Sequence, residues 1–453
     1  MQVNLKHVAQ QVVESAVKGG ADGAECVIRE GQGFSTTVRM GEVEQLKEAG
    51  SKALGLRVLV GRRCSSSYTS DFSAAGLERA VSNALAMARL TSEDPYAGLP
   101  EPSALGSAPG DLGLYFDDVQ ALSTAERIAM ARRAEQAALG FDSRIRNSEG
   151  ASFQAREGSM ILANSLGFSG EYRSSSVSLS AEPVAVASEN SSTGMVRDYW
   201  FTASRSLTGL EDAESVGRIA AERALRRLGA RKIQTCRVPV VFEPRTAKTL
   251  LSHLFDAVSG DAVYRQSTYL AGKLGEAVAS SAVSVWDDGT RPGGFGTSPF
   301  DDEGVPTRRT AVVENGVLRN YLLNCYAGRK LSLPTTGNAS RGLAGTPGIG
   351  PGNFFLQPGT KSPQEVIAGV PDGLYVTEFL GHGVNLVTGD FSRGASGLWI
   401  RNGELTYPVE EITVAGNLRD MLQNISEIAS DLDFRGSIAA PTLRIDGLTV
   451  AGE

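Results

Sequence analysis

The chain has few of the residues that carry metal, disulfide or membrane chemistry. It contains 3 histidines and 4 cysteines in 453 residues. No Cys-x-x-Cys spacing occurs, so the cysteines predict reduced cytosolic thiols rather than a zinc knuckle or a disulfide framework; they are Cys26, Cys64, Cys236 and Cys325. No run approaches the roughly 18 apolar residues that a membrane-spanning helix needs, so we expect no membrane association.

Positive charge is also scarce. The 44 Lys and Arg residues are outnumbered by 51 Asp and Glu residues, which gives a net charge of −7. A broad basic surface for nucleic acid is therefore not expected. The first residues form an amphipathic pattern without the basic and apolar regions of a secretory signal. We accordingly predict a cytoplasmic protein without a nucleic-acid partner.

The remaining composition is that of an ordinary soluble protein, with 41% hydrophobic and 21% charged residues. A chain of 453 residues is too long for one core. We predict an α+β protein with an N-terminal α/β domain (1–110), a middle α+β domain with an antiparallel sheet (111–232) and a mostly antiparallel β domain (233–453). The last domain is expected to be a barrel or sandwich with packed helices.

Periodic apolar residues support the first two segments. Leu5, Val8 and Val12 share one face of a predicted first helix, and the continuous run Ala53–Val60 predicts a buried strand. A Pro/Gly/Ser-rich stretch at 98–110 predicts a linker. In the middle segment a capping box at 123–126 opens a helix. Alternating polar segments at 145–154, 157–164 and 170–182 then predict antiparallel strands with one solvated face. A helix is predicted to follow at 211–228.

The third segment is marked by two Asn-Gly pairs between alternating apolar residues, at Asn315 and Asn402. Such pairs predict type I′ hairpins, because both central residues need positive φ. Residues 245–261 predict an amphipathic core helix with Leu250, Leu251 and Leu254 on one face. A second helix is predicted over 417–429.

Several motifs together resemble the TldD/PmbA family, also called modulators of DNA gyrase, over nearly the whole chain. They are Gly55-Leu-Arg-Val58, Thr69-Ser-Asp-Phe-Ser73, Ala163-Asn-Ser-Leu-Gly-Phe-Ser-Gly170, Phe300-Asp-Asp-Glu-Gly-Val-Pro-Thr307, Glu314-Asn-Gly-Val-Leu318, Thr336-Gly-Asn338 with Arg341, and Thr388-Gly-Asp-Phe-Ser392. In the TldD branch the helix matching 245–261 carries His-Glu-x-x-x-His, and a late Cys supplies a third zinc ligand. Here the helix offers only His253, and residues 433–441 contain no Cys. The chain therefore resembles the PmbA (TldE) branch.

The resemblance implies a metallopeptidase complex in which a TldD-like paralogue holds the zinc and this chain pairs with it. Such a complex cleaves short or unfolded polypeptides and leaders of peptide precursors. No catalytic, cofactor or metal residue is then expected in this chain. Two alternatives remain open: an active hydrolase with a displaced metal site, and a regulatory or binding homodimer.

Six residues are candidates for lining a substrate cavity, by motif position: His253, Asn338, Arg341, His382, Asn385 and Asp390. For each, a role in fixing a turn or in the core stays open. His253 borders an apolar helical face, which is typical of a hydrogen-bonded, partly buried histidine. The ligands of a displaced metal site would be His253, Asp256, His382 and Asp390.

Overall fold

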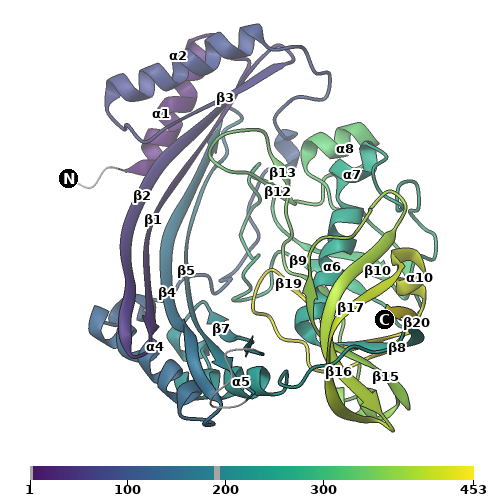
Figure 1. The fold of residues 1–453 in the computed structure, drawn as a ribbon. Helices are drawn as coiled ribbons and strands as arrows, with labels where there is room; N and C mark the ends of the chain where they lie inside the picture. Colours follow the sequence, from purple (N-terminus) through teal and green to yellow (C-terminus); the bar gives the residue numbers. More distant parts are fainter. Residues whose placement is uncertain (1–3, 188–193, 453) are drawn as a thin grey trace.

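The computed structural model describes residues 4–187 and 194–452. A long curved sheet built from the first half of the chain stands beside a second body built from the C-terminal half (Figure 1). Between them lie loops of the C-terminal half that carry β12 (Ala339–Ser340) and β13 (Gly348–Ile349). The α+β class predicted from the sequence is confirmed.

The curved sheet has seven antiparallel strands in the order β3-β2-β1-β4-β5-β6, with β7 also paired to β5. They are β1 (Gly23–Arg39), β2 (Glu42–Val60), β3 (Arg63–Thr69), β4 (Ile145–Asn164), β5 (Ser169–Ala185), β6 (Val196–Arg197) and β7 (Trp200–Ser204). Strand β1 pairs with β4 from Glu25 to Val38, so the strands before and after residue 110 share one sheet. The division of the chain at residues 110 and 232 stays a prediction.

Two pairs of helices cover opposite ends of one face of this sheet. Helices α1 (Leu5–Lys18) and α2 (Ala74–Leu90) pack on one end, and α4 (Thr124–Leu139) and α5 (Ala213–Leu225) pack on the other. The predicted capping box is present, because Ser123 and Glu126 cap α4 reciprocally. Three short helices lie in the connections: η1 (Pro102–Ala104), α3 (Asp118–Ala121) and η2 (Leu207–Gly209).

The C-terminal half contains a closed five-stranded barrel, which decides between the predicted barrel and sandwich. The barrel closes because β17 pairs with both β16 and β20. Its strands are β8 (Cys236–Phe242), β15 (Asp372–Leu380), β16 (Asp390–Arg401), β17 (Glu404–Asn417) and β20 (Leu443–Ala451), and β18 (Ile425–Ile428) extends β20. A separate sheet contains β9 (Val285–Asp288), β10 (Arg309–Glu314), β11 (Val317–Leu318), β14 (Phe354–Leu356) and β19 (Ile438–Ala439).

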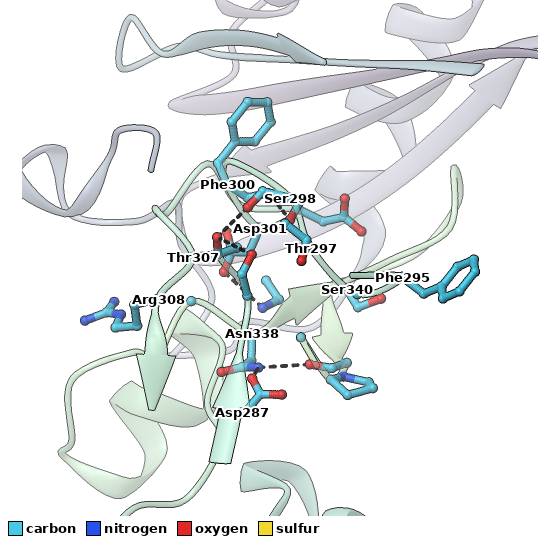
Figure 2. Close-up of a pocket in the computed structure, with 18 of the residues that line it drawn as sticks. Asp287, Phe295, Thr297, Ser298, Phe300, Asp301, Thr307, Arg308, Asn338 and Ser340 are labelled. Carbon is cyan, nitrogen blue, oxygen red and sulfur yellow. Dashed lines mark hydrogen bonds between the residues drawn. The ribbon is translucent and has the colours of Figure 1, made fainter. Parts of the chain in front are cut away.

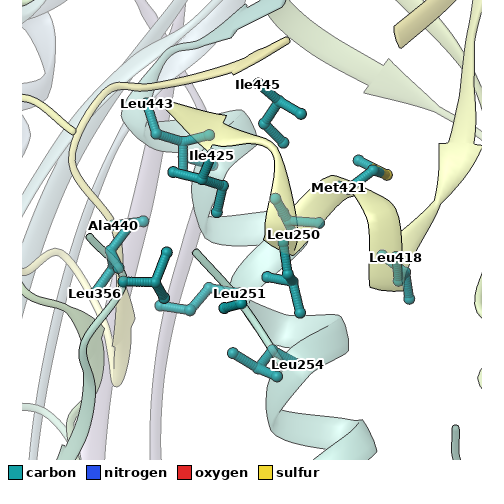
Figure 3. Packing of buried hydrophobic residues seen from close by; sticks show 14 of the residues in the cluster. Leu250, Leu251, Leu254, Leu356, Leu418, Met421, Ile425, Ala440, Leu443 and Ile445 are labelled. Atoms are coloured by element: carbon teal, nitrogen blue, oxygen red, sulfur yellow. The ribbon is translucent and has the colours of Figure 1, made fainter. Parts of the chain in front are cut away.

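Helix α6 (Pro244–Val258) is the centre of the C-terminal core. Pro244 stands at its first turn, where the missing N–H costs nothing. Leu250, Leu251 and Leu254 are each at most 5% exposed and join one apolar cluster with Leu443 and other barrel residues (Figure 3). Burying each leucine contributes about 1.5–3 kcal/mol. Four shorter helices complete this half: α7 (Gly260–Tyr264), α8 (Cys325–Leu331), α9 (Pro363–Ala368) and α10 (Leu418–Gln423).

The local predictions for this half were right for the turns and wrong for one helix. Both Asn-Gly hairpins are present, with φ of 49° and 82° at Asn315 and Gly316, and 52° and 78° at Asn402 and Gly403. The helix predicted over 417–429 ends at Gln423, because Ile425 pairs with Ile445 and the following residues form β18. No described helix is long and apolar enough to cross a membrane.

Candidate functional site

The N-terminal half of α6 borders a pocket of about 620 Å³ between the curved sheet and the C-terminal half. The loop before β20 forms another wall, so two stretches of chain almost 200 residues apart meet here. The lining residues are Tyr199, Trp200, Phe201, Arg223, Arg226, Glu243, Pro244, Arg245, Lys248, Thr249, Tyr375, Asp431, Asp433, Arg435, Ile438, Ala439 and Ala440.

Buried ion pairs fix the floor of this pocket. Glu243, which precedes α6, accepts from Arg223 at 2.6 Å and from Arg226 at 3.2 Å. Asp198 lies 3.3 Å from Arg223 and 3.0 Å from Arg245. Burial alone would raise the pKa of Asp198, but the two arginines outweigh it and hold the pKa below its usual value. These bonds orient α5 and the start of α6 rigidly toward each other.

The opposite wall is held by Arg435 of the loop before β20. Its guanidinium pairs with Glu211 at 2.7 Å and lies 4.1 Å from the centre of the Trp200 ring. Lys248 extends from α6 toward the same loop, and its Nζ lies 3.5 Å from the position that a Cβ on Gly436 would occupy. Burial lowers the pKa of Lys248. The pocket thus combines cationic and aromatic side chains.

The predicted residue His253 lies on α6 but does not line this pocket. Its ring packs edge-on against Phe391, with centroids 6.3 Å apart. Burial and the nearby Arg393 charge lower the pKa of His253 and so favour its neutral form. Its Nε2 is buried and has no hydrogen-bond partner within the part of the chain that the structure describes.

Two other predicted residues, His382 and Asn385, lie in the loop that leads into β16, and a third, Asp390, is the first residue of that strand. His382 is exposed. Asn385 accepts hydrogen bonds from the backbone N–H groups of Val387 and Thr388, and Asp390 accepts from the Thr388 hydroxyl at 2.6 Å. These contacts fix the turn, and a role in a substrate cavity stays a prediction. Across residues 4–187 and 194–452, no three His, Cys, Asp or Glu side chains gather closely enough to hold a metal ion, so the four-residue site written for a displaced metal is not formed.

Asn338 lines a smaller cavity of about 210 Å³, between the curved sheet and loops of the C-terminal half (Figure 2). Its amide donates to Asp287 at 2.7 Å and to the Gly350 carbonyl at 3.1 Å. Burial raises the pKa of Asp287 to about 7. Burial and the Glu303 carboxylate also raise the pKa of Asp301, whose oxygens accept three backbone N–H bonds. The motif 300–307 therefore contributes buried carboxyl side chains to the wall of this cavity, which Arg29 and Arg308 also line.

Arg341 is buried and joins the two halves of the molecule. Its Nη1 donates to Glu25 of β1 at 2.5 Å, and Arg57 of β2 donates to the same carboxylate at 2.6 Å. Burial would raise the pKa of Glu25, but Arg341 and Arg57 hold it below its usual value. Of the predicted residues, Asn338 and Arg341 thus lie at the contact between the halves, away from His253.

Sequence reasoning missed the residues of the α6 pocket, Lys248, Thr249 and Arg435 among them. The one available signal was spacing, because Lys248 and Thr249 stand five and four residues before His253. The aromatic wall at 199–201 carried no such signal, since only the folded chain places it beside α6.

Comparison with known proteins defines the class of protein to which this fold and pocket belong. Family models match three parts of the chain: PmbA/TldA metallopeptidase domain 1 at residues 24–88, the central domain at 117–228 and the C-terminal domain at 235–452. The chain belongs to the PmbA/TldD metallopeptidase family.

Individual relatives refine this assignment. The chain is 37% identical to the metalloprotease PmbA of Escherichia coli O157:H7, over 99% of this chain and 97% of that protein. A TldD homologue of Haemophilus influenzae is 31% identical over 43% of this chain and 44% of its own length. The crystal structure of a putative modulator of DNA gyrase from Bacteroides thetaiotaomicron superposes with a TM-score of 0.92 at 29% identity, over all of both chains. TldE from Thermococcus kodakarensis shares the fold, with a TM-score of 0.88 at 22% identity, over 98% of this chain and 100% of that one.

Proposed function

We propose that this chain is the PmbA/TldE-like subunit of a cytoplasmic TldD/TldE-type metallopeptidase complex. The complex cleaves short or unfolded polypeptides, including leader regions of peptide precursors. The TldD-like paralogue holds the catalytic zinc. This chain holds none; it completes the enclosure around the site and helps to admit the substrate.

The observation that carries the proposal is the chemistry of the α6 pocket. Helix α6 has one histidine, His253, and no glutamate, so it cannot supply His-Glu-x-x-x-His in any register. Lys248 and Thr249 are among the residues that it offers to the pocket instead. A protonated lysine has no lone pair for zinc, and a threonine hydroxyl is a poor general base at pH 7. The loop before β20 meets this same stretch of α6 and brings Asp433 and Arg435 rather than a thiolate.

An extended peptide suits the molecule better than a folded substrate does. The C-terminal half is rich in short strands, and an extended peptide can add to a sheet edge through backbone hydrogen bonds with little sequence preference. The aromatic residues Tyr199, Trp200 and Phe201, which line the α6 pocket, offer apolar surface for the side chains of a peptide. Both features favour a role in substrate admission without requiring a nucleophile in this chain.

A reconstitution assay tests the proposal. Cleavage of an unstructured peptide is measured with this chain, with a TldD-like paralogue and with both, and zinc is quantified in each sample. We expect cleavage only from the mixture, and zinc only in the paralogue. Efficient cleavage by this chain alone, with about one zinc per chain, would establish the displaced-site hydrolase instead. Failure of the two proteins to associate would favour the regulatory homodimer.

Two variants sharpen the test. Lys248→Ala in this chain should leave the turnover of the assembled complex within about twofold, because the ammonium group takes no part in the chemistry. His253→Ala should likewise preserve the zinc content of the complex. A loss of more than about 100-fold from either variant, in a complex that still assembles, would place the catalytic centre in this chain.

A further inference from the structure

Arg156 of β4 stands without a partner on the inner face of the curved sheet, the face opposite to the one that α1, α2, α4 and α5 cover. Its neighbour Ala155 is buried in the cluster beneath α4 and α5, so Arg156 points the other way. It lies opposite Gly33 of β1, where a Cβ would be 3.9 Å from its Cγ. The Arg156 side chain is exposed and has no hydrogen bond or ion pair with the described part of the chain.

Three polar side chains surround Arg156 on this face. Strand pairing sets Ser176 of β5 directly opposite Arg156, and Ser178 opposite Gln154. The Cβ atoms of such pairs lie about 4.5–5.5 Å apart. None of the three has a side-chain hydrogen bond to another described residue. With Phe201, Ala203 and Phe295 these side chains line a pocket of about 280 Å³. We call it the Arg156 pocket.

Two phenylalanines supply apolar walls to the Arg156 pocket. Phe201 belongs to β7 and also lines the α6 pocket, so the two pockets adjoin. Phe295 lies in the loop between β9 and β10 and extends away from the Asn338 cavity (Figure 2). Arg205 fixes this loop, because it donates to the carbonyls of Gly294 and Phe295 at 3.0 Å and 2.9 Å. Apolar walls thus stand beside a floor of hydrogen-bond donors.

The surroundings of the Arg156 pocket carry positive charge. Alternate residues from Gly31 to Thr37 of β1 face inward, together with the residues that pair with them on β2 and β4 and with those opposite on β5. This group includes Arg156 and Lys47 and contains no Asp or Glu. Such a patch attracts anions, although the whole chain has a net charge of −7. One guanidinium matches one carboxylate, whereas a nucleic-acid strand would need several cations.

We propose that the Arg156 pocket binds the C-terminal carboxylate of a peptide that ends in an apolar residue. The carboxylate pairs with the guanidinium of Arg156, and the hydroxyl groups of Ser176 and Ser178 donate to it. The last side chain lies between Phe201 and Phe295. Carboxylate and side chain share one α-carbon, so a single peptide end reaches the donors and the apolar walls together. The choice of a peptide as the ligand rests on the proposed function.

Calorimetric titration of short peptides into the isolated full chain tests the pocket without zinc or a paralogue. The probe is acetyl-alanyl-alanyl-leucine with a free carboxylate. We expect its C-terminal amide to bind roughly tenfold more weakly or worse, because the charge-assisted hydrogen bonds are lost. Replacing the leucine by glycine should weaken binding by roughly fivefold or more, because the apolar walls then have no side chain to cover.

Arg156→Gln should weaken binding of the free acid by roughly tenfold or more and abolish the preference for acid over amide. Arg156→Lys keeps the charge without the fork and should retain part of the affinity. The matched control is Lys47→Gln, which removes a charge from the same face two strands away and should change the affinity by less than about threefold. Arg156 has no partner, so its variants should unfold thermally like the wild type.

Three results would overturn the inference: no binding of the free acid, equal binding of acid and amide, or equal losses from Arg156→Gln and Lys47→Gln. A fourth is equal binding of acetyl-alanyl-glutamyl-alanine amide, which would assign the pocket to acidic side chains instead. The titrations are separate from the reconstitution assay. A reconstituted pair that cleaves nothing would count against the proposed function alone, whereas a failed titration would count against this pocket alone.

Discussion

The Glu25→Gln substitution gives the sharpest test of how the two halves of the molecule are held together. Glu25 is fully buried and lies between Arg57 of β2 and Arg341 of the C-terminal half, at 2.6 Å and 2.5 Å. Glutamine keeps the shape of the side chain but removes its charge. The buried guanidinium groups of Arg57 and Arg341 would then lose the carboxylate that neutralises them. Arg57 would keep only the weaker attraction of the Glu303 carboxylate.

Removing one partner from a buried ion pair costs about 3–5 kcal/mol. Glu303 offsets part of this cost, so we expect a loss of about 3 kcal/mol in the free energy of unfolding. The matched control is Glu30→Gln on the same strand. Glu30 pairs with Lys52 at 3.5 Å, with side chains 47% and 33% exposed. Such a surface pair contributes at most about 1 kcal/mol.

Urea unfolding, followed by circular dichroism and by the fluorescence of Trp200, Trp286 and Trp399, measures both variants. The difference between wild type and Glu25→Gln should also shrink in acid. Because the pKa of Glu25 is depressed in the folded chain, its contribution is present above the unfolded pKa of about 4.3 and is lost as the pH falls through the folded pKa. Equal stability of Glu25→Gln and Glu30→Gln at pH 7 would refute this reasoning.

Three further predictions concern other buried features. Asp287→Asn should flatten the pH dependence of the free energy of unfolding. Burial raises the pKa of Asp287 to about 7, so the protonated carboxyl stabilises the fold fully below its unfolded pKa of about 4. That stabilisation is lost as the pH rises through 7. Urea titrations at pH 5 and 8 should therefore differ less in the variant than in wild type. Gly55→Ala should cost about 1–3 kcal/mol, since the new Cβ would collide with the Leu343 carbonyl, whereas Gly50→Ala on the same strand has room; thermal unfolding of both variants compares them. Asn402→Ala should lower stability by about 1 kcal/mol in the same assay, because its φ is 52° and the hairpin turn needs a left-handed residue.

Local patterns predicted the elements whose formation depends on near neighbours. The Asn-Gly hairpins at Asn315 and Asn402 and the Ser123 capping box are present, because turns and caps are set within four residues. The helix predicted over 417–429 was wrong beyond Gln423, since pairing with Ile445 decides the conformation of Ile425. The exposed half of β2 was not predicted, because charged residues at 42–52 carry no alternation.

The residues of the candidate site also separate into those that local sequence could predict and those that only the fold places. Sequence alone placed His253 on a core helix and found no cysteine in residues 433–441. It could not place Asn338 beside Asp287, or Arg341 against Glu25 across 316 positions of sequence.

The sequence by itself determined the family, the α+β class and the identity of the side chains available for chemistry, because motifs and periodicity are local properties. Only the tertiary structure decided that α6 meets the loop before β20 in one pocket, and that β1 and β4 join the first two segments in one sheet. It also decided that half of β2 is left as a free edge. Contacts between distant segments depend on how complete faces pack, and no short pattern of residues records that packing.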